Sequence, residues 1–171
     1  MKRTTTLLAI GALTAGTLVL SAGESFADDR VCRSTIGKVT IDDNIVVPKG
    51  ATCTLKGTTV KGNVIVKSGA KLVFNYGRVD GNIQANGSRW VHVTGVRVEG
   101  SIQLKSGNGA IGLRQNRVKG DIQLFSNRGK GAKYVYRNSV DGNLQCKSNS
   151  PAPTGGRNVV DGNKEDQCRR L

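Results

Sequence analysis

The chain has 171 residues and carries 26 basic and 12 acidic side chains, which give a formal net charge of +14. Its length suits a single domain, but aromatic residues make up only 4% of it, which excludes an ordinary globular core built on aromatic packing. So strong a positive charge indicates an anionic partner and carries no information about the fold.

The N-terminal residues have the pattern of an export signal. Basic residues at positions 2 and 3 precede an apolar stretch over 7–20, and residues 25–27 read Ser-Phe-Ala, a plausible cleavage site. The apolar stretch is short for a membrane span, so we expect no membrane insertion. We predict that residues 1–27 are a signal peptide and that the mature protein, with a net charge of about +13, is extracellular or associated with the cell wall.

A five-residue motif, Val-X-Gly-Asn-Ile, organises the rest of the chain. Its copies occupy residues 60–64, 79–83, 98–102, 118–122, 140–144 and 160–164, and a degenerate copy at 41–45 has Asp43 in place of the glycine. The glycines are 19, 19, 20, 22 and 20 residues apart, a period typical of a stacked solenoid. We therefore expect an N-terminal cap over 28–40, six to seven coils over 41–163 and a C-terminal cap or tail over 164–171.

Each coil is predicted to contain three short parallel strands. In the first strand, apolar residues at motif positions 5 and 7 flank a mostly polar residue, as in a strand with one buried face. The second strand is expected to point these pairs inward: Cys53 and Leu55, Leu72 and Phe74, Val91 and Val93, Ile111 and Leu113, and Tyr134 and Tyr136. The valine of the next motif begins the third strand. Coils of 19–22 residues exceed the strict repeat of left-handed hexapeptide helices, so the fold class is an all-β, single-stranded, right-handed parallel β-helix.

The polar residues of the motif have predicted roles in the corners of the coil. The glycines are expected to supply the positive φ of a tight turn. The residues after them are expected to form a hydrogen-bonded column along the stack, through Asn44, Asn63, Asn82, Ser101, Asp121, Asn143 and Asn163. Residues 148–156 contain two prolines and no alternating pattern, so we expect a loop that covers the open end of the stack.

Four cysteines lie in the mature part of the chain, where an oxidising compartment favours disulfides. Cys32 and Cys53 are 21 residues apart, and Cys146 and Cys168 are 22 apart, which is about one coil in each case. Stacked coils lie about 4.8 Å apart, and a disulfide needs Cα atoms about 4.4–6.8 Å apart. Of the three pairings that four cysteines allow, we expect Cys32–Cys53 and Cys146–Cys168, each joining a terminal coil to its neighbour.

The corner pattern V-x-G-[NSD]-[IVL], followed by an aliphatic strand, resembles the coil of bactofilin-like, polymer-forming β-helices. More broadly, it is similar to small secreted bacterial proteins of the pectate-lyase-like superfold. The resemblance covers about residues 41–163 and implies a rigid rod. Bactofilins are cytoplasmic and polymerise end to end, whereas this chain has an export signal, paired cysteines and a basic charge, so we expect a monomer.

Right-handed β-helices include enzymes that cleave acidic polysaccharides, which makes a carboxylate pair worth seeking. Asp80 and Glu99 occupy motif position 2 of adjacent coils, but Lys61 and Lys119 flank them, as in a charge-alternating ladder exposed to solvent. His92, the sole histidine, shares its strand with no carboxylate. We expect no catalytic residue, no metal and no cofactor, and the protein is predicted not to be an enzyme.

Stacking turns one residue per coil into a row with a spacing of about 4.8 Å. Arg78, Arg97 and Arg117 form one such row, either a docking stripe for an anionic polymer or three solvated arginines. A second row is expected to form an outward amide ladder, through Gln84, Gln103, Gln123 and Gln145, with Lys67, Lys105 and Lys147 two positions further along the chain.

Another candidate surface is the outer side of the second strand. Trp90 and His92 alternate there, with Lys71 on the preceding coil, and an exposed tryptophan can stack on a sugar ring or a base. These surfaces predict a noncatalytic secreted β-helix that binds an anionic envelope polymer or polysaccharide through basic ladders. The alternatives are a small polysaccharide-active enzyme and a structural protein that assembles end to end. Charge alone predicts nonspecific binding to nucleic acid, and we expect no specific nucleic-acid partner.

Overall fold

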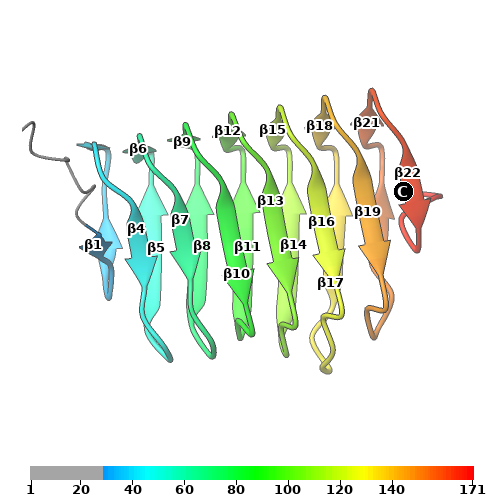
Figure 1. The fold of residues 1–171 in the computed structure, drawn as a ribbon, viewed down its shortest axis with the longest axis horizontal. Helices are drawn as coiled ribbons and strands as arrows, with labels where there is room; N and C mark the ends of the chain where they lie inside the picture. The colour runs from blue at the N-terminus through cyan, green and yellow to red at the C-terminus, as the bar shows by residue number, and fades with distance from the viewer. Residues whose placement is uncertain (1–28) are drawn as a thin grey trace, which may run out of the picture.

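The computed structural model describes residues 29–171, so the expected export signal lies outside the described residues. Parallel strands in three sheets build an elongated solenoid of about seven turns, and no helix occurs in this part of the chain (Figure 1). In Figure 1 the chain descends along the near sheet, returns upward along the far sheet and advances along the axis, so the coil is right-handed. The predicted right-handed parallel β-helix is confirmed.

Each coil contributes one strand to each of three sheets, which we name in chain order. The first sheet contains β1 (Arg30–Val31), β4 (Ile45–Val47), β7 (Val64–Val66), β10 (Ile83–Asn86), β13 (Ile102–Lys105), β16 (Ile122–Phe125), β19 (Leu144–Lys147) and β22 (Lys164–Asp166). The second contains β2 (Thr35–Ile36), β5 (Thr52–Lys56), β8 (Lys71–Asn75), β11 (Trp90–Thr94), β14 (Ala110–Arg114), β17 (Lys133–Tyr136) and β20 (Thr154–Gly156). The third contains β3 (Thr40–Ile41), β6 (Thr59–Val60), β9 (Arg78–Val79), β12 (Arg97–Val98), β15 (Arg117–Val118), β18 (Ser139–Val140) and β21 (Val159–Val160).

The core consists of aliphatic columns that run along the axis. Motif positions 1, 5 and 7 are buried from coil to coil, as Val79, Ile83 and Ala85 illustrate. Strand pairing keeps equivalent residues in register, so that Ile83 lies between Val64 and Ile102. Burying short aliphatic side chains against their own copies supplies the apolar contact that the scarce aromatic residues cannot.

The motif glycines are required for a different reason from the one that the sequence suggested. None of them has a positive φ, so the expectation of a left-handed corner is wrong. A Cβ atom on Gly81 would lie 2.6 Å from Oδ1 of Asn63 and 2.7 Å from the carbonyl oxygen of Gly62. Glycine is therefore selected because the preceding coil leaves no room for a side chain.

The asparagine column beside these glycines forms as predicted. The backbone N–H of Asn82 donates to Oδ1 of Asn63 at 2.9 Å, and the backbone N–H of Ser101 donates to Oδ1 of Asn82 at 2.8 Å. The same pattern continues to Asp121, whose carboxylate accepts from the backbone N–H of Asn143 at 2.7 Å. One backbone N–H at each of these corners has no partner within the sheets, and the preceding coil supplies its acceptor.

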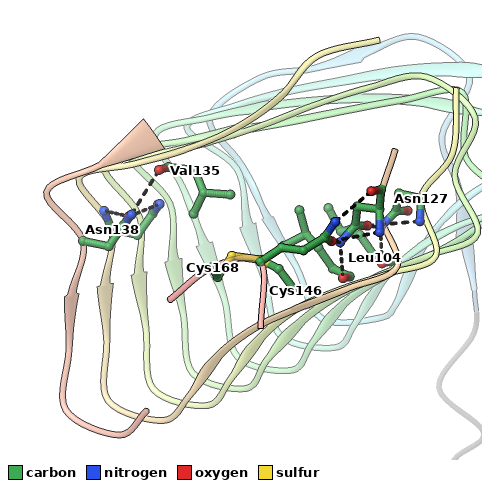
Figure 2. The surroundings of a disulfide bond; sticks show 10 residues. Leu104, Asn127, Val135, Asn138, Cys146 and Cys168 are labelled. Carbon is green, nitrogen blue, oxygen red and sulfur yellow. Dashed lines mark hydrogen bonds between the residues drawn. A yellow bond between two sulfur atoms is a disulfide. The ribbon is translucent and has the colours of Figure 1, made fainter. Parts of the chain in front are cut away.

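Two further amide ladders lie inside the solenoid, and the sequence did not reveal them. One contains Asn116, Asn138 and Asn158 at the corner between the second and third sheets, and the other contains Asn127, Asn149 and Gln167 at the corner between the first and second. Their side-chain amides also donate to buried carbonyls, as Asn127 does to Leu104 at 2.8 Å (Figure 2). Within the described residues, no buried side-chain nitrogen or oxygen lacks a hydrogen-bond partner.

Short strands extend the sheets into the segments at both ends of the repeated coils. Residues 30–41, placed in the N-terminal cap and at its border, form β1, β2 and β3, which pair with the next coil. At the other end, β22 pairs with β19, and part of the segment expected to be a loop forms β20, the last strand of the second sheet. The sequence gives no sign of β20, because two of its three residues are glycine and have no side chain that could alternate between buried and exposed.

Both predicted disulfides are present. The Cα atoms of Cys32 and Cys53 are 5.5 Å apart, and those of Cys146 and Cys168 are 5.2 Å apart. Figure 2 shows the second disulfide inside the C-terminal end of the solenoid, close to the asparagine ladders. Each bridge joins a terminal coil to its neighbour at the positions where stacking is one-sided.

Candidate functional site

The third sheet places the predicted arginine row on its outer face. Register pairs Arg78 with Arg97, and Arg97 with Arg117, so the three side chains do lie on consecutive coils. They alternate with buried valines, as Val98 between Arg97 and Glu99 shows. Motif position 2 therefore emerges on the same face as the arginines, two residues further along the chain.

Carboxylates occupy most of this row. Nε of Arg78 lies 2.6 Å from Asp80, and another guanidinium nitrogen of Arg78 lies 3.1 Å from Glu99. Nε of Arg97 lies 2.7 Å from Glu99, whose other oxygen contacts Lys119. Within residues 29–171 no carboxylate forms an ion pair with Arg117. The row is therefore largely a charge-alternating network, with one guanidinium left for another partner.

The same network bears on the carboxylate pair considered for catalysis. Lys119 and then Arg97 hold the pKa of Glu99 down to about 2 by donating hydrogen bonds to its carboxylate. A carboxylate with so low a pKa stays ionised at neutral pH and has no proton to give as a general acid. Asp80 accepts a hydrogen bond from Arg78 at 2.6 Å. Asp80 and Glu99 are thus used to order the arginine row.

The second sheet presents aromatic side chains on its outer face, around β11. The rings of Trp90 and His92 lie 4.6 Å apart between centroids and are tilted by 45°. Trp90 has Lys71 beside it on the preceding coil and Ala110 on the next, as predicted for Lys71. Trp90 is 40% exposed, so part of its surface is open to a ligand.

His92 lies partly buried against a gap in the next coil. Its register partner is Gly112, and a Cβ atom there would come within 3.0 Å of Cδ2 of the imidazole. Burial, and then the positive charge of Arg114, lower the pKa of His92. A neutral imidazole at pH 7 can accept or donate a hydrogen bond to a ligand hydroxyl.

Tyr134 and Tyr136 point outward, so the prediction that both lie in the core is wrong. Register places Tyr134 beside Gly112 and Tyr136 beside Arg114, while Val135 is fully buried. Tyr134 is 44% exposed. We call the surface of Trp90, His92, Tyr134 and Tyr136 the aromatic face.

The reversal has its cause in Lys133, which is buried although it is charged. Its Nζ donates to the carbonyl oxygens of Gly131 and Ser150, both at 3.0 Å, and to that of Gly129 at 3.4 Å. Gly129 and Gly131 belong to the longer turn before β17, and Ser150 belongs to the following coil. Alternation in the sequence favoured burying the tyrosines over a lysine, and only the turn's free carbonyls make the opposite register acceptable.

Cations accompany each part of the aromatic face. The guanidinium carbon of Arg114 lies 5.4 Å from the ring centroid of Tyr134, and that of Arg137 lies 5.3 Å from Tyr136. Beside Trp90 is an open hollow of about 380 Å³, lined by Lys71, Arg89, Trp90, Asn108, Gly109, Ala110 and Gly131. The surface therefore combines flat rings, two basic side chains in a hollow and an amide.

Sequence reasoning placed Trp90, His92 and Lys71 on this outer face but missed the tyrosines and the arginines beside them. A usable signal was present in the small residues Ala110 and Gly112, which leave space on the outer face of β14. Arg114 alternates with them and could have been assigned to the same face by its parity.

Metal-ligating clusters and membrane-spanning helices are both absent from the part of the chain that the structure covers. Among residues 29–171, no three side chains of His, Cys, Asp or Glu gather in a way that would hold a metal ion. The same residues include no helix that is long and apolar enough to cross a membrane. Comparisons with protein-family models, with curated proteins and with solved structures found no match to the chain.

Proposed function

We propose that this protein is an exported, noncatalytic β-helix that binds an acidic polysaccharide of the cell envelope through its aromatic face. The observation that carries the proposal is the exposure of Trp90 and Tyr134 on one sheet, with Lys71, Arg89 and Arg114 beside them. Flat aromatic rings stack on the apolar faces of sugars, and basic groups meet carboxylate or sulfate substituents.

Rigidity strengthens this proposal. The rings project from strands that are paired on both sides, so little backbone freedom is lost when a ligand binds. Tyr134 lies two coil steps beyond Trp90, which corresponds to about 9.6 Å along the axis. Two stacking positions at that separation suit an extended oligosaccharide better than a single sugar.

The aromatic face is a better candidate than the arginine row. Arg78 and Arg97 already bind Asp80 and Glu99, so an anionic ligand would have to compete with these carboxylates. Arg114 and Arg137 contact aromatic rings and form no ion pair within residues 29–171. Their charge is available to a ligand that the rings hold in place.

Export and a relation to the pectate-lyase-like superfold belong to the same proposal. Two disulfides are compatible with an oxidising, extracellular compartment. The motif pattern at residues 60–64 and its repeats supports a relation to small secreted β-helices. Mass spectrometry of the mature N-terminus after expression with residues 1–27 would test the export signal.

The binding site is tested by measuring affinity for oligosaccharides of polygalacturonate, alginate and hyaluronan by calorimetry at two salt concentrations. Loss of one stacking ring, in Trp90→Ala or Tyr134→Ala, should weaken binding roughly fivefold to tenfold, from about 1 kcal/mol of stacking free energy. Tyr76→Ala is the matched control, because Tyr76 is 69% exposed but lies beyond the end of β8.

The Trp90 and Tyr134 variants should lose affinity while Tyr76→Ala keeps it. Equal losses in all three variants, or unchanged binding in the Trp90→Ala, Tyr134→Ala double variant, would contradict the assignment of the site. Circular dichroism of each variant confirms that the fold is retained, since these side chains are exposed.

A further inference from the structure

The outer face of the first sheet carries a continuous ladder of amides. Nε2 of Gln84 donates to Oε1 of Gln103 at 3.3 Å, and Gln103 donates in the same way to Gln123 at 3.2 Å. Gln123 donates to Gln145 at 2.9 Å, and Gln145 donates to the carboxylate of Glu165 at 2.9 Å. The predicted glutamine ladder is confirmed, and its amides point in one direction along the axis.

Lysines lie beside this ladder on every second coil. Lys105 pairs in register with Asn86 on one side and Phe125 on the other, and Phe125 pairs with Lys147. Lys67 directly follows Val66, which pairs with Ala85, so Lys67 lies beside Asn86 on the preceding coil. We name Lys67, Lys105 and Lys147 the lysine row. Its members are two coils, or about 9.6 Å, apart.

The lysine row is free of carboxylate partners, in contrast to the arginine row. No ion pair in residues 29–171 includes Lys67, Lys105 or Lys147. The ammonium group of Lys105 lies 5.8 Å from the ring centroid of Phe125, which limits where it can move. Three cations therefore project from one face at a regular spacing.

A hollow of about 520 Å³ lies at the N-terminal end of this row. Its lining includes Lys67 and Lys105 and the apolar residues Ile65 and Ala85. Gln84, Asn86 and Gln103 also line it, so the hollow offers amide groups next to two cations. A volume of this size matches small-ligand sites in proteins, which span about 300–1,000 Å³.

We infer that the first sheet binds a linear acidic glycan that carries one carboxylate on every second sugar and lies parallel to the solenoid axis. An extended sugar residue advances a chain by a distance similar to one coil. Alternate sugars would then place their carboxylates at the lysine row, while the glutamine ladder donates and accepts hydrogen bonds with the hydroxyls between them.

The residues between the lysines argue against a glycan with an acid on each sugar. Such a chain would place every second carboxylate beside Asn86 or Phe125, which carry no charge of their own. Desolvating a carboxylate against a phenyl ring without a partner costs free energy. The spacing of the lysines, as distinct from their number, thus selects the ligand.

This inference rests on the proposed function for the class of ligand, but it uses another sheet. It is tested with hyaluronan oligosaccharides, which carry a carboxylate on every second sugar, and polygalacturonate oligosaccharides of equal length, which carry one on each. The Lys67→Ala, Lys105→Ala, Lys147→Ala triple variant should bind hyaluronan about tenfold more weakly, since three exposed ion pairs of about 0.5 kcal/mol each add up to about 1.5 kcal/mol. The matched control is the Lys38→Ala, Lys56→Ala, Lys61→Ala triple variant, which removes the same charge from exposed sites on other parts of the coil.

A second variant tests spacing without removing any lysine. Asn86→Lys with Phe125→Lys fills both gaps in the row and should raise affinity for polygalacturonate several-fold more than affinity for hyaluronan. Equal weakening by the two triple variants, or equal gains for both glycans in the filled variant, would show that net charge alone is read and would overturn the inference.

The outcomes also separate this site from the aromatic face. Hyaluronan binding that depends on the lysine row and is unaffected by Trp90→Ala supports the first-sheet site and counts against the aromatic face. Binding that depends on Trp90 and is unaffected by loss of the lysine row overturns the first-sheet site and leaves the proposed function standing.

Discussion

Gly81→Ala provides a direct test of why the motif requires glycine. Because φ at Gly81 is not positive, the backbone itself can accept alanine, and the cost comes only from the preceding coil. The added Cβ would lie 2.6 Å from Oδ1 of Asn63 and 2.7 Å from the carbonyl oxygen of Gly62. Neither atom is the free end of a flexible chain, since Asn63 is held in the asparagine column.

The expected destabilisation follows from the hydrogen bonds that must change. Oδ1 of Asn63 accepts from the backbone N–H and from the side-chain amide of Asn82, at 2.9 and 3.2 Å. Moving Asn63 away from the new methyl group weakens both bonds and leaves a corner N–H without its acceptor. At about 1–3 kcal/mol for an unsatisfied polar group, the loss should be about 2–4 kcal/mol, equivalent to a fall in Tm of roughly 5–15 °C.

Urea denaturation with both disulfides intact measures this effect, with two glycine variants as references. Gly69→Ala has room for its Cβ, 3.7 Å from the nearest atom, but a φ of +69°, so it should lose about 1 kcal/mol. Gly37→Ala has neither problem and should change stability little. The reasoning is refuted if Gly81→Ala costs no more than Gly69→Ala at an unchanged m-value.

Two predictions concern pH. The pKa of Glu99 is about 2 in the folded protein against an ordinary 4.5, so its stabilising contribution is complete above pH 4.5 and is lost as pH falls toward 2. Glu99→Gln should therefore flatten the dependence of stability on pH in that range, as measured by urea denaturation. An unchanged dependence in the variant would contradict the ion-pair network. Burial lowers the pKa of Lys133 below its ordinary 10.5, so the folded state binds fewer protons than the unfolded state and stability should rise with pH through the window below 10.5. Lys133→Met removes that titration, and a rise of equal slope in the variant would show that another group causes it.

The period of the motif was sufficient to predict the fold class, because a solenoid repeats each local interaction. Every coil buries its apolar residues against the same positions of the next, so one alignment of the repeats identifies the core columns and the rows on the surface. The spacing of Cys32 and Cys53 by one coil predicted a disulfide for the same reason. The glutamine ladder and the register of the arginine row followed equally well.

Two features depended on contacts between coils that no single repeat displays. The motif glycines are selected by the closeness of the preceding coil, as the position of Asn63 next to Gly81 shows. Two members of the arginine row, Arg78 and Arg97, form ion pairs with Glu99, which also reaches Lys119 and so joins three coils. Both effects depend on distances that are set only when the coils stack.

The candidate site was predicted only in part, because its register is decided by a single turn. Alternation along β17 allows either the tyrosines or Lys133 and Val135 to face the core, and hydrophobicity favours the tyrosines. Carbonyl oxygens of Gly129, Gly131 and Ser150 converge on Nζ of Lys133 and reverse that preference. A buried ammonium group is acceptable only where such acceptors are in place, and the folded chain alone brings them together.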